Sequence, residues 1–433
     1  MRSYLRKARL TLFSINLWRR RLVFWFGAIT VGIISSYFAL AVDETNKIFE
    51  QWIKPNPLLT LIISPLIFAL CAWLTSFVPT VRGSGIPQVI AARVLRDPKN
   101  RERLLGIHIA FIKIFLTLLG LLAGASIGRE GPTVQVGASI MLLCATIGGI
   151  SAQRGVVLAG AAAGVAAAFN TPLAGIVFAI EEMARAFEHR NSSIVLIAIV
   201  LSGGAAMSIM GNYDYFGYTD IYIPLNSSWL PILIIGGVGG ICGGIFARLI
   251  TNGEGFLRNR FGKFGIKRPI LFAAICGLTV AAIGIMSGGI TYGTGYTLGH
   301  DLLHGKLEAE WWQMPAKLLA TTLSTISGIP GGIFSPSLSV GASLGAGIAD
   351  WFPSIQTQGV IVLAMVAYFA GVTQAPITAF VIVLEITGNA TDAVPLIAAG
   401  VIATAISRMI SPTSLYHSLA KSFMLDEKAA KTA

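Results

Sequence analysis

The sequence of 433 residues carries little charge and few of the side chains on which soluble enzymes rely. Charged residues make up 12% of it, whereas they approach about a quarter of an ordinary globular chain. It has only five histidines and four cysteines, and the cysteines all lie within apolar stretches. Their spacing predicts neither a metal centre nor a disulfide framework. We therefore expect no enzyme, no metal and no cofactor.

Apolar residues and glycine are what the chain has in excess. Hydrophobic residues account for 54% of it, and there are 48 glycines. Apolar stretches long enough to cross a bilayer recur along the whole chain, which predicts an all-α, polytopic membrane protein. The formal net charge of +12 is spread over short loops between these stretches, as topology signals are. A nucleic-acid partner is therefore not expected.

The distribution of basic residues predicts the topology. The segment 1–21 has seven Arg or Lys residues and no acid, and the apolar run 22–42 follows it. This run is too long for a signal peptide, so we expect a retained first helix and a cytoplasmic N-terminus. The other apolar segments are 58–78, 104–127, 155–183, 193–210, 229–250, 269–287, 313–327, 330–349, 359–384 and 394–410. The basic loops 93–103, 185–190 and 258–268 should be cytoplasmic, and 212–228 should face outward.

An internal repeat divides the chain into two halves. One pattern occurs twice: first as Gly128-x-Glu130-x-Pro132 followed by Val136-Gly137-Ala138-Ser139, and again as Gly332-x-Phe334-x-Pro336 followed by Val340-Gly341-Ala342-Ser343. In the second copy, Phe334 takes the place of Glu130. The same offset, from 128 to 332, superposes Pro172 on Pro376 and Glu181 on Glu385. We expect two repeated halves, 22–210 and 229–410, joined by an external loop at 211–228 and followed by a C-terminal helix and tail at 411–433. Short pieces interrupted by glycine or proline predict the broken helices of a transporter.

Glu130 is the most costly feature of the chain, because it lies between two apolar runs. A carboxylate at such a depth costs about 2.5–3.5 kcal/mol on insertion scales, so it is either paired or functional. Pro132 suits a first helical turn, and Gly83–Pro87 and Gly328–Pro336 share this pattern of glycine followed by proline. Free N–H groups at three such helix starts would bind a small anion and still release it. The alternative is that the glycines serve helix packing. Three motifs and a repeat favour the anion site.

The same motifs resemble a known family. Gly83-Ser84-Gly85-Ile86-Pro87, Gly128-Arg129-Glu130-Gly131-Pro132 and Gly332-Ile333-Phe334-Ser335-Pro336 look like the three signatures of the CLC chloride channels and chloride/proton antiporters. The resemblance covers nearly the whole chain. It implies two inverted halves with tilted, broken helices, and a homodimer with one anion path per subunit. Because the chain ends soon after Tyr416, the cytoplasmic regulatory domain of many eukaryotic members is not expected, and the type is bacterial.

The resemblance also implies roles for individual residues. Glu130 matches the gating glutamate, which blocks the anion path when deprotonated and receives the external proton. Glu182 matches the internal proton-transfer glutamate, and Ser84 the serine that favours chloride over nitrate. The implied chloride-binding set is Ser84, Gly85, Ile86, Arg129, Glu130, Gly131, Ile333, Phe334 and Tyr416.

Two further sites have two interpretations each. The pair Glu181-Glu182 is either an interfacial helix end paired with Arg185, or a proton path with Glu181 at its water-filled entrance. The resemblance favours the proton path, and Glu385 is then structural. Lys113 either snorkels to the interface or supplies a positive field along the anion path. Some bacterial members have acids where this chain has Gln88 and Ile90, which leaves the partner of Lys113 open.

The sequence therefore predicts a chloride/proton antiporter of the bacterial inner membrane, with both termini cytoplasmic. Its substrates would be chloride and protons. One alternative is a passive voltage- or pH-gated chloride channel on the same scaffold, which would commonly have an apolar residue in place of Glu182. A fluoride exporter is a second alternative, which Gly128-Arg129-Glu130 and Tyr416 argue against.

Overall fold

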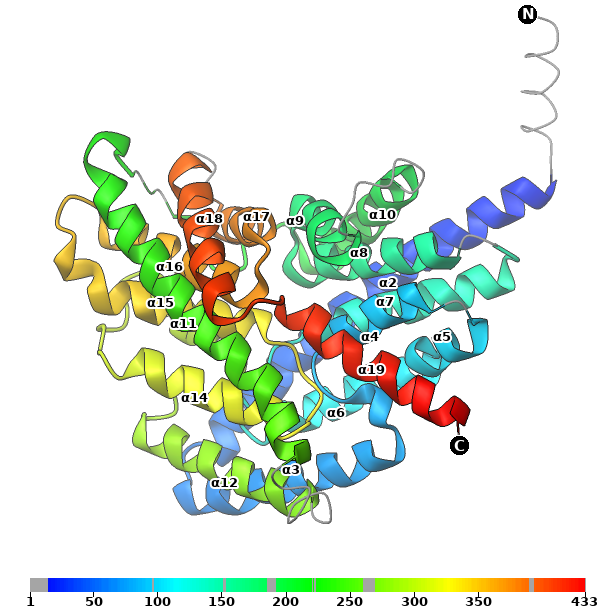
Figure 1. Cartoon of the computed structure of the whole chain (residues 1–433), viewed down its shortest axis with the longest axis horizontal. Helices are drawn as coiled ribbons and strands as arrows, with labels where there is room; N and C mark the ends of the chain where they lie inside the picture. The colour runs from blue at the N-terminus through cyan, green and yellow to red at the C-terminus, as the bar shows by residue number, and fades with distance from the viewer. Residues whose placement is uncertain are drawn as a thin grey trace, which may run out of the picture.

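The computed structural model describes residues 15–95, 97–150, 153–184, 192–219, 221, 223–259, 269–388 and 393–432. These residues form helices joined by turns (Figure 1). The first half contains α2 (Ile15–Ile48), α3 (Pro57–Phe77), α4 (Ile86–Val94), α5 (Pro98–Leu105), α6 (Ile107–Leu122), α7 (Glu130–Ile147), α8 (Gln153–Phe169), α9 (Pro172–Phe178) and α10 (Ser192–Met210). The second contains α11 (Leu225–Asn259), α12 (Pro269–Met286), α13 (Tyr296–Leu303), α14 (Gln313–Ile326), α15 (Phe334–Ile348), α16 (Thr357–Thr373), α17 (Pro376–Thr387) and α18 (Ala393–Ile410). The C-terminal α19 (Leu415–Thr432) follows.

Long apolar helices confirm a polytopic membrane protein. Within the described ranges, seven helical stretches are long and apolar enough to cross a bilayer. They are Trp18–Trp52, Pro57–Phe77, Pro98–Leu122, Ser193–Met210, Trp229–Gly253, Pro269–Met286 and Ala393–Ile410. The apolar helices α8, α16 and α17 are shorter than a bilayer requires. Residues Gly359 to Thr373 of α16 are buried throughout, so this helix lies inside the protein.

Two segments predicted as continuous are broken in the structure. In 155–183 the break is at Asn170, whose φ is 60°, and in 359–384 it is at Gln374, whose φ is 59°. Each residue is left-handed and precedes a Pro that begins the next helix, Pro172 or Pro376. A left-handed residue stops an α-helix, and proline at N1 starts a new one. The prediction missed the left-handed residues because neither is a glycine.

Some predicted loops contain short helices, and others lie outside the described residues. The stretch between the predicted segments 269–287 and 313–327 contains α13, and the basic loop 93–103 contains the end of α4 and most of α5. The basic loop at 185–190, residues 260–268 of the loop at 258–268, and residues 1–14 are outside the described part of the chain.

Repeat mates bind one another reciprocally where the two halves meet. The N–H of Gly128 donates to the carbonyl of Gly332 at 2.7 Å, and Gly332 returns the same bond at 2.7 Å, as an antiparallel bridge. Glu181 accepts from the first turn of α17, and its mate Glu385 accepts from the first turn of α9. The two short helices lie side by side (Figure 1). Reciprocal contacts between mates mean that a local two-fold axis relates the halves, which run in opposite directions at the bridge.

Small residues bring the central helices close together. A β-carbon on Gly137 of α7 would overlap the backbone carbonyl of Gly160 in α8, and a β-carbon on Gly160 would overlap the carbonyl of Gly137. Gly341 and Gly345 of α15 pack in the same way against α16. Close backbone approach at small residues is how helices associate in membranes. Packing thus explains these glycines, but not those at the helix starts described next.

Candidate functional site

The N-termini of α7 and α15 meet at Glu130. This residue is the first of α7, and its side chain is fully buried. Its Oε1 accepts a hydrogen bond from the hydroxyl of Ser335, and its Oε2 lies 3.5 Å from the backbone nitrogen of the same residue. The first N–H groups of a helix lack intrahelical partners and carry partial positive charge. The Glu130 carboxyl group therefore occupies donors at the start of α15, where an anion could bind.

A third helix start joins these two. Gly83 has a φ of 63° and Gly85 a φ of 107°, values that favour glycine, and α4 begins directly afterwards at Ile86. The N–H of Gly331, just before α15, donates to the carbonyl of Gly83 at 3.1 Å. The structure thus brings together all three motifs predicted to form an anion site. The nine residues of the predicted chloride-binding set are buried: Ser84, Gly85, Ile86, Arg129, Glu130, Gly131, Ile333, Phe334 and Tyr416.

Two buried hydroxyls at this junction have unused donors. Ser84 is 6% exposed and Tyr416 is fully buried; their hydroxyls lie near each other, but neither makes a hydrogen bond of normal geometry among the described residues. A buried polar group without a partner costs about 1–3 kcal/mol, so such groups point to a ligand. The ring of Phe334 lies 5.9 Å from that of Tyr416, between centroids. Hydroxyls and helix-start N–H groups are donors suited to a halide ion.

The partner of Lys113 is the backbone. Its Nζ donates to the carbonyls of Val81 at 2.9 Å and Gly83 at 2.6 Å. The amide of Gln88 donates to two further carbonyls of the same turn, those of Thr80 and Arg82. An acid at position 88 or 90 is thus not needed to hold the lysine. These bonds direct the carbonyls of Val81 and Gly83 toward Lys113.

Lys317 repeats this arrangement in the second half and was missed by the sequence analysis. It lies at the repeat offset from Lys113, is fully buried, and donates to the carbonyls of Thr291 at 2.9 Å and Gly293 at 3.0 Å. The turn that it holds, Gly293-Thr294-Gly295, precedes α13 as Gly83-Ser84-Gly85 precedes α4. Applying the repeat offset to Lys113 would have found it.

The two adjacent glutamates have different surroundings. Both oxygens of Glu181 accept backbone N–H groups of α17, from Ile377 at 3.2 Å and Thr378 at 2.6 Å. Glu385 binds α9 in the same manner, so Glu181 is a cap of α17, and its expected place at the entrance of a proton path stays a prediction. Glu182 is 4% exposed and lies in the π-helical turn Ala179–Ala184. Its Oε1 is 3.4 Å from Nδ1 of His417, and the expected partner Arg185 is outside the described residues.

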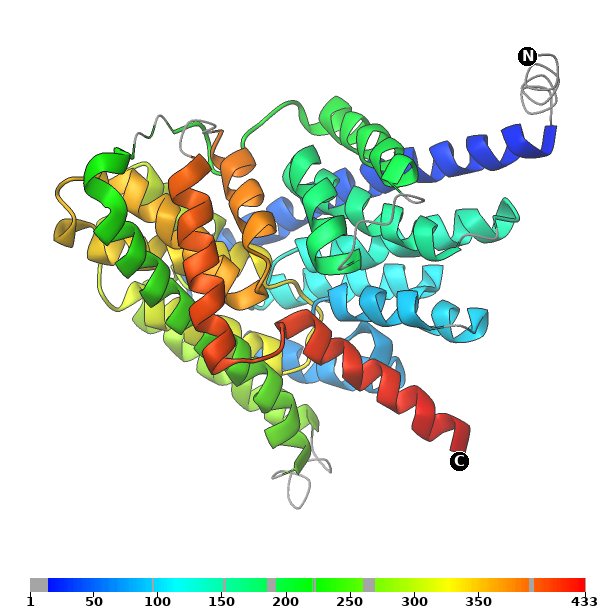
Figure 2. The same cartoon turned by 45° about the horizontal axis from the view of Figure 1, so that its top comes forward.

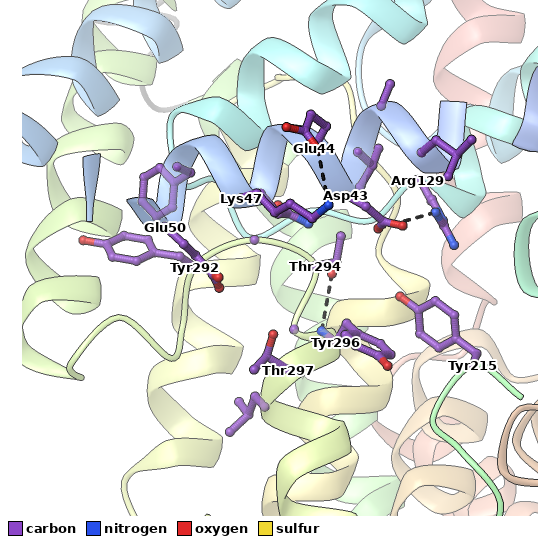
Figure 3. Close-up of a pocket in the computed structure, with 18 of the residues that line it drawn as sticks. Asp43, Glu44, Lys47, Glu50, Arg129, Tyr215, Tyr292, Thr294, Tyr296 and Thr297 are labelled. Carbon is purple, nitrogen blue, oxygen red and sulfur yellow. Dashed lines mark hydrogen bonds and ion pairs between the residues drawn. The ribbon is translucent and has the colours of Figure 1, made fainter. Parts of the chain in front are cut away.

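A cavity of about 1150 Å³ lies beside Arg129 (Figure 3). It is lined by the end of α2 and by the turn that precedes α13. Figure 3 shows Asp43 and Arg129 facing each other, with 3.8 Å between the charged groups. The guanidinium of Arg129 lies 5.8 Å from the ring centroid of Tyr215, whose hydroxyl is 3.2 Å from that of Ser335. Two hydroxyls thus connect the cavity wall to Glu130.

Comparisons with known proteins identify the family. The family model described as voltage gated chloride channel matches residues 67–408. This chain belongs to that family. The H(+)/Cl(-) exchange transporter ClcA of Yersinia pestis bv. Antiqua (strain Angola) is 30% identical over 465 residues, which cover 99% of this chain and 93% of that protein. The family is thus one of ion channels and transporters.

Solved structures confirm the predicted CLC-like fold. That of a slow cyanobacterial Cl-/H+ antiporter has a TM-score of 0.81 at 23% identity, covering 95% of this chain and 99% of that one. That of a CLC-type fluoride/proton antiporter has a TM-score of 0.77 at 22% identity, covering 93% and 98%. The fold is therefore shared by transporters of different halides, and the anion must be inferred from the site.

Two sequence patterns that enzymes use also occur, but their structures do not support catalysis. His300-x-x-x-His304 places the centroids of two imidazoles 4.5 Å apart at the end of α13, and Asp301 contacts His300, yet the described residues contain no group of three or more that could hold a metal ion. The serine of Gly341-x-Ser343-x-Gly345 lies inside α15 and donates to the carbonyl of Ser339. It is not on the strand-to-helix turn that a nucleophilic serine of this pattern requires.

Ser335 is expected to hold Glu130 in place. Ser335→Ala removes the hydroxyl that donates to the carboxylate, and a hydrogen bond to a charged group contributes about 1.5–3 kcal/mol. Chloride should then displace Glu130 more easily, and the half-saturating chloride concentration of transport should fall about tenfold. Chloride flux from vesicles, measured against chloride concentration, tests this. Ser343→Ala, further along the same helix, removes a buried hydroxyl that donates to the carbonyl of Ser339 and should leave the concentration dependence unchanged. An unchanged value in Ser335→Ala would mean that the hydroxyl does not hold the carboxylate.

Proposed function

We propose that this protein exchanges chloride for protons across a membrane. The observation that carries the proposal is the position of the Glu130 carboxylate on the donors of α15, at the junction of three helix starts. Carboxylate and chloride are alternative anions for one set of donors. Protonation removes the charge of Glu130 and weakens its hold on these donors, so an arriving proton opens the site to chloride. When Glu130 loses its proton, the carboxylate returns to these donors and displaces chloride.

The donor set explains how an anion can be both bound and released. It consists of helix-start N–H groups with the hydroxyls of Ser84 and Tyr416, which carry partial charges. The nearest full positive charges are directed elsewhere: Lys113 binds carbonyls, and Arg129 faces Asp43. Partial charges stabilise a halide without trapping it, whereas a full charge at contact distance would bind it tightly.

Glu182 favours exchange over passive conduction. A second carboxylate, nearly buried, lies on the side of Phe334 where Tyr416 and α19 are found. A passive channel has no need for a titratable group there, whereas proton transfer through the protein requires one. The ClcA relatives are named as H(+)/Cl(-) exchangers, which supports the same choice.

Reconstituted vesicles test the function. A chloride gradient is imposed with no proton gradient, and both ions are followed. Uphill proton movement is expected, with chloride as the driving ion. Chloride permeability without proton movement would instead indicate a channel. Repeating the experiment with fluoride as the driving anion distinguishes a fluoride exporter, which should move fluoride and exclude chloride.

Ser84 should contribute to the choice of anion. Ser84→Pro removes a donor that a small, strongly hydrogen-bonding ion such as chloride uses more than nitrate does. Loss of one hydrogen bond to an ion, about 1.5 kcal/mol or more, should raise the nitrate/chloride flux ratio about tenfold. Anion competition in vesicles measures this ratio. Ser139→Ala, which removes a buried hydroxyl bonded to the carbonyl of Gln135, is the control. A ratio that stays constant in Ser84→Pro would place selectivity elsewhere.

We also propose a homodimer in the bacterial inner membrane, with both termini in the cytoplasm. Leu173 of α9 and Ile377 of α17 are exposed. Both helices are too short to cross a bilayer. A second copy would cover them. The basic start of α2, the α5 region and the end of α19 lie toward the same side in both views (Figures 1 and 2), as expected for a cytoplasmic face. Light scattering in detergent distinguishes a dimer from a 45.8 kDa monomer.

A further inference from the structure

Glu182 must receive its proton through a group that reaches solvent, because its own side chain is only 5% exposed. Its neighbour Glu181 is poorly suited to this task, since both of its oxygens accept backbone N–H groups of α17. Protonation of Glu181 would weaken these two bonds and uncap a helix. The proton therefore needs another carrier.

His417 has the required position. Its Nδ1 lies 3.4 Å from Oε1 of Glu182, and its side chain is 20% exposed. The residue belongs to the first turn of α19, directly after Tyr416. The hydroxyl of Ser414 is 3.2 Å from the same ring nitrogen and fixes the orientation of the ring. The side chain thus touches a buried carboxylate at one nitrogen and solvent over part of its surface.

The imidazole also has the required chemistry. It is the side chain that both gains and loses a proton near neutral pH, and its two nitrogens can bind different partners. We propose that His417 is the proton-entry residue of the exchanger, which passes protons between solution and Glu182. The proposal rests on the proposed exchange function, because it names the donor for the internal glutamate.

The transfer balances as a simple proton step. One ring nitrogen takes a proton from hydronium in solution, which becomes water, and the ring becomes imidazolium. The N–H bond at Nδ1 then breaks, and an O–H bond forms at Oε1 of Glu182, so imidazolium and carboxylate become neutral imidazole and carboxylic acid. Rotation of the ring, or exchange of its remaining N–H proton with water, restores the starting state. The reverse sequence delivers protons to solution.

Other charged and titratable groups lie next to this pair without replacing it. Arg93 of α4, the helix on which α19 packs, donates to the carbonyl of Met183. Tyr416 is fully buried. His417 both contacts Glu182 and has solvent exposure. The arginine, bound to a carbonyl, supplies positive charge rather than a proton.

Two variants test the proposal in vesicles. His417→Gln keeps a side chain that can hydrogen-bond with Glu182 and Ser414 but cannot carry a proton. Its proton flux should fall about tenfold or more at neutral pH, while chloride flux remains at the wild-type level. In His417→Ala, added imidazole should restore proton flux. His108→Gln, a substitution at an exposed histidine of α6, should change neither flux.

The pH profile separates proton entry from a structural role. The defect of His417→Gln should be greatest at neutral pH and shrink in acid, where hydronium is abundant enough to protonate Glu182 directly. Wild-type coupling in His417→Gln at neutral pH, or a uniform loss at every pH without imidazole rescue of His417→Ala, would overturn the proposal. Absence of proton coupling in the wild-type protein would instead overturn the exchange function itself.

Discussion

Glu130→Gln should abolish proton coupling and remove the pH dependence of chloride flux. Glutamine has nearly the shape of glutamate but is neutral at every accessible pH, so it cannot alternate between an anion and a neutral group. The oxygen of its amide can still accept a hydrogen bond from Ser335. Because the amide is neutral, however, it binds the donors of α15 more weakly than a carboxylate or a chloride ion does. The site should therefore stay open to chloride, whatever the proton concentration.

Vesicles containing the variant should show rapid chloride flux under a chloride gradient and proton flux at background. The chloride flux should be flat with pH, whereas wild-type flux should rise as pH falls, because protonation releases Glu130 from the site. Glu310→Gln, at an exposed acid outside the site, is the matched control and should preserve coupling and the pH profile. A Glu130→Gln protein that still moves protons uphill would mean that another group carries the external proton.

The sequence was sufficient to predict the spans and the two-fold repeat, because both depend on local composition. Long apolar runs give the spans, and glycine followed by proline gives the helix starts. The breaks at Asn170 and Gln374 were not predicted, since left-handed asparagine and glutamine have no local signal as strong as glycine. The second half is also six residues shorter between Gly293 and Lys317 than the first is between Gly83 and Lys113. A single offset therefore could not superpose Gly293 on Gly83.

The motif residues were predicted to meet and do so, but their supporting contacts could not be predicted. The contacts of Glu130 with Ser335, and of Glu182 with His417, join residues 205 and 235 positions apart. Such contacts depend on how α7, α15 and α19 pack, which composition does not determine. Ser335 lies within one of the three quoted motifs and His417 directly follows Tyr416, so position in or next to a motif was the signal that could have found them.

The two-fold arrangement separates scaffold from function. Gly128 and Gly332, Lys113 and Lys317, and Glu181 and Glu385 are mates that make the same contacts in both halves. Such pairs build the helix starts. The mate of Glu130, by contrast, is Phe334, and the structural counterpart of Ser84 is Thr294. The residues assigned to ion exchange are thus those at which the halves differ, as expected if a symmetric frame holds an asymmetric path.

Glu182→Gln should separate the two ions, with chloride flux retained and proton flux lost. The side chain lies in a π-helical turn on the side of Tyr416 and His417, away from the Glu130–Ser335 contact. Glutamine keeps the volume and hydrogen-bonding groups of glutamate, so the fold and the donors at Ser84 and α15 should be unchanged. A neutral amide neither releases nor accepts a proton near neutral pH, so proton delivery to the inner part of the path stops. Glu130 can still alternate with chloride at the start of α15.

The adjacent Glu181 provides a matched control, because it differs from Glu182 in structure rather than in chemistry. Glu181→Gln replaces a charged cap of α17 by a neutral one, which should lower the free energy of unfolding by about 1 kcal/mol and leave the proton/chloride ratio unchanged. Simultaneous proton and chloride recordings, with thermal unfolding in detergent, distinguish the two variants. If Glu181→Gln lost coupling and Glu182→Gln kept it, the two glutamates would have exchanged roles, and the proton path would run along the first turn of α17 instead of through Glu182.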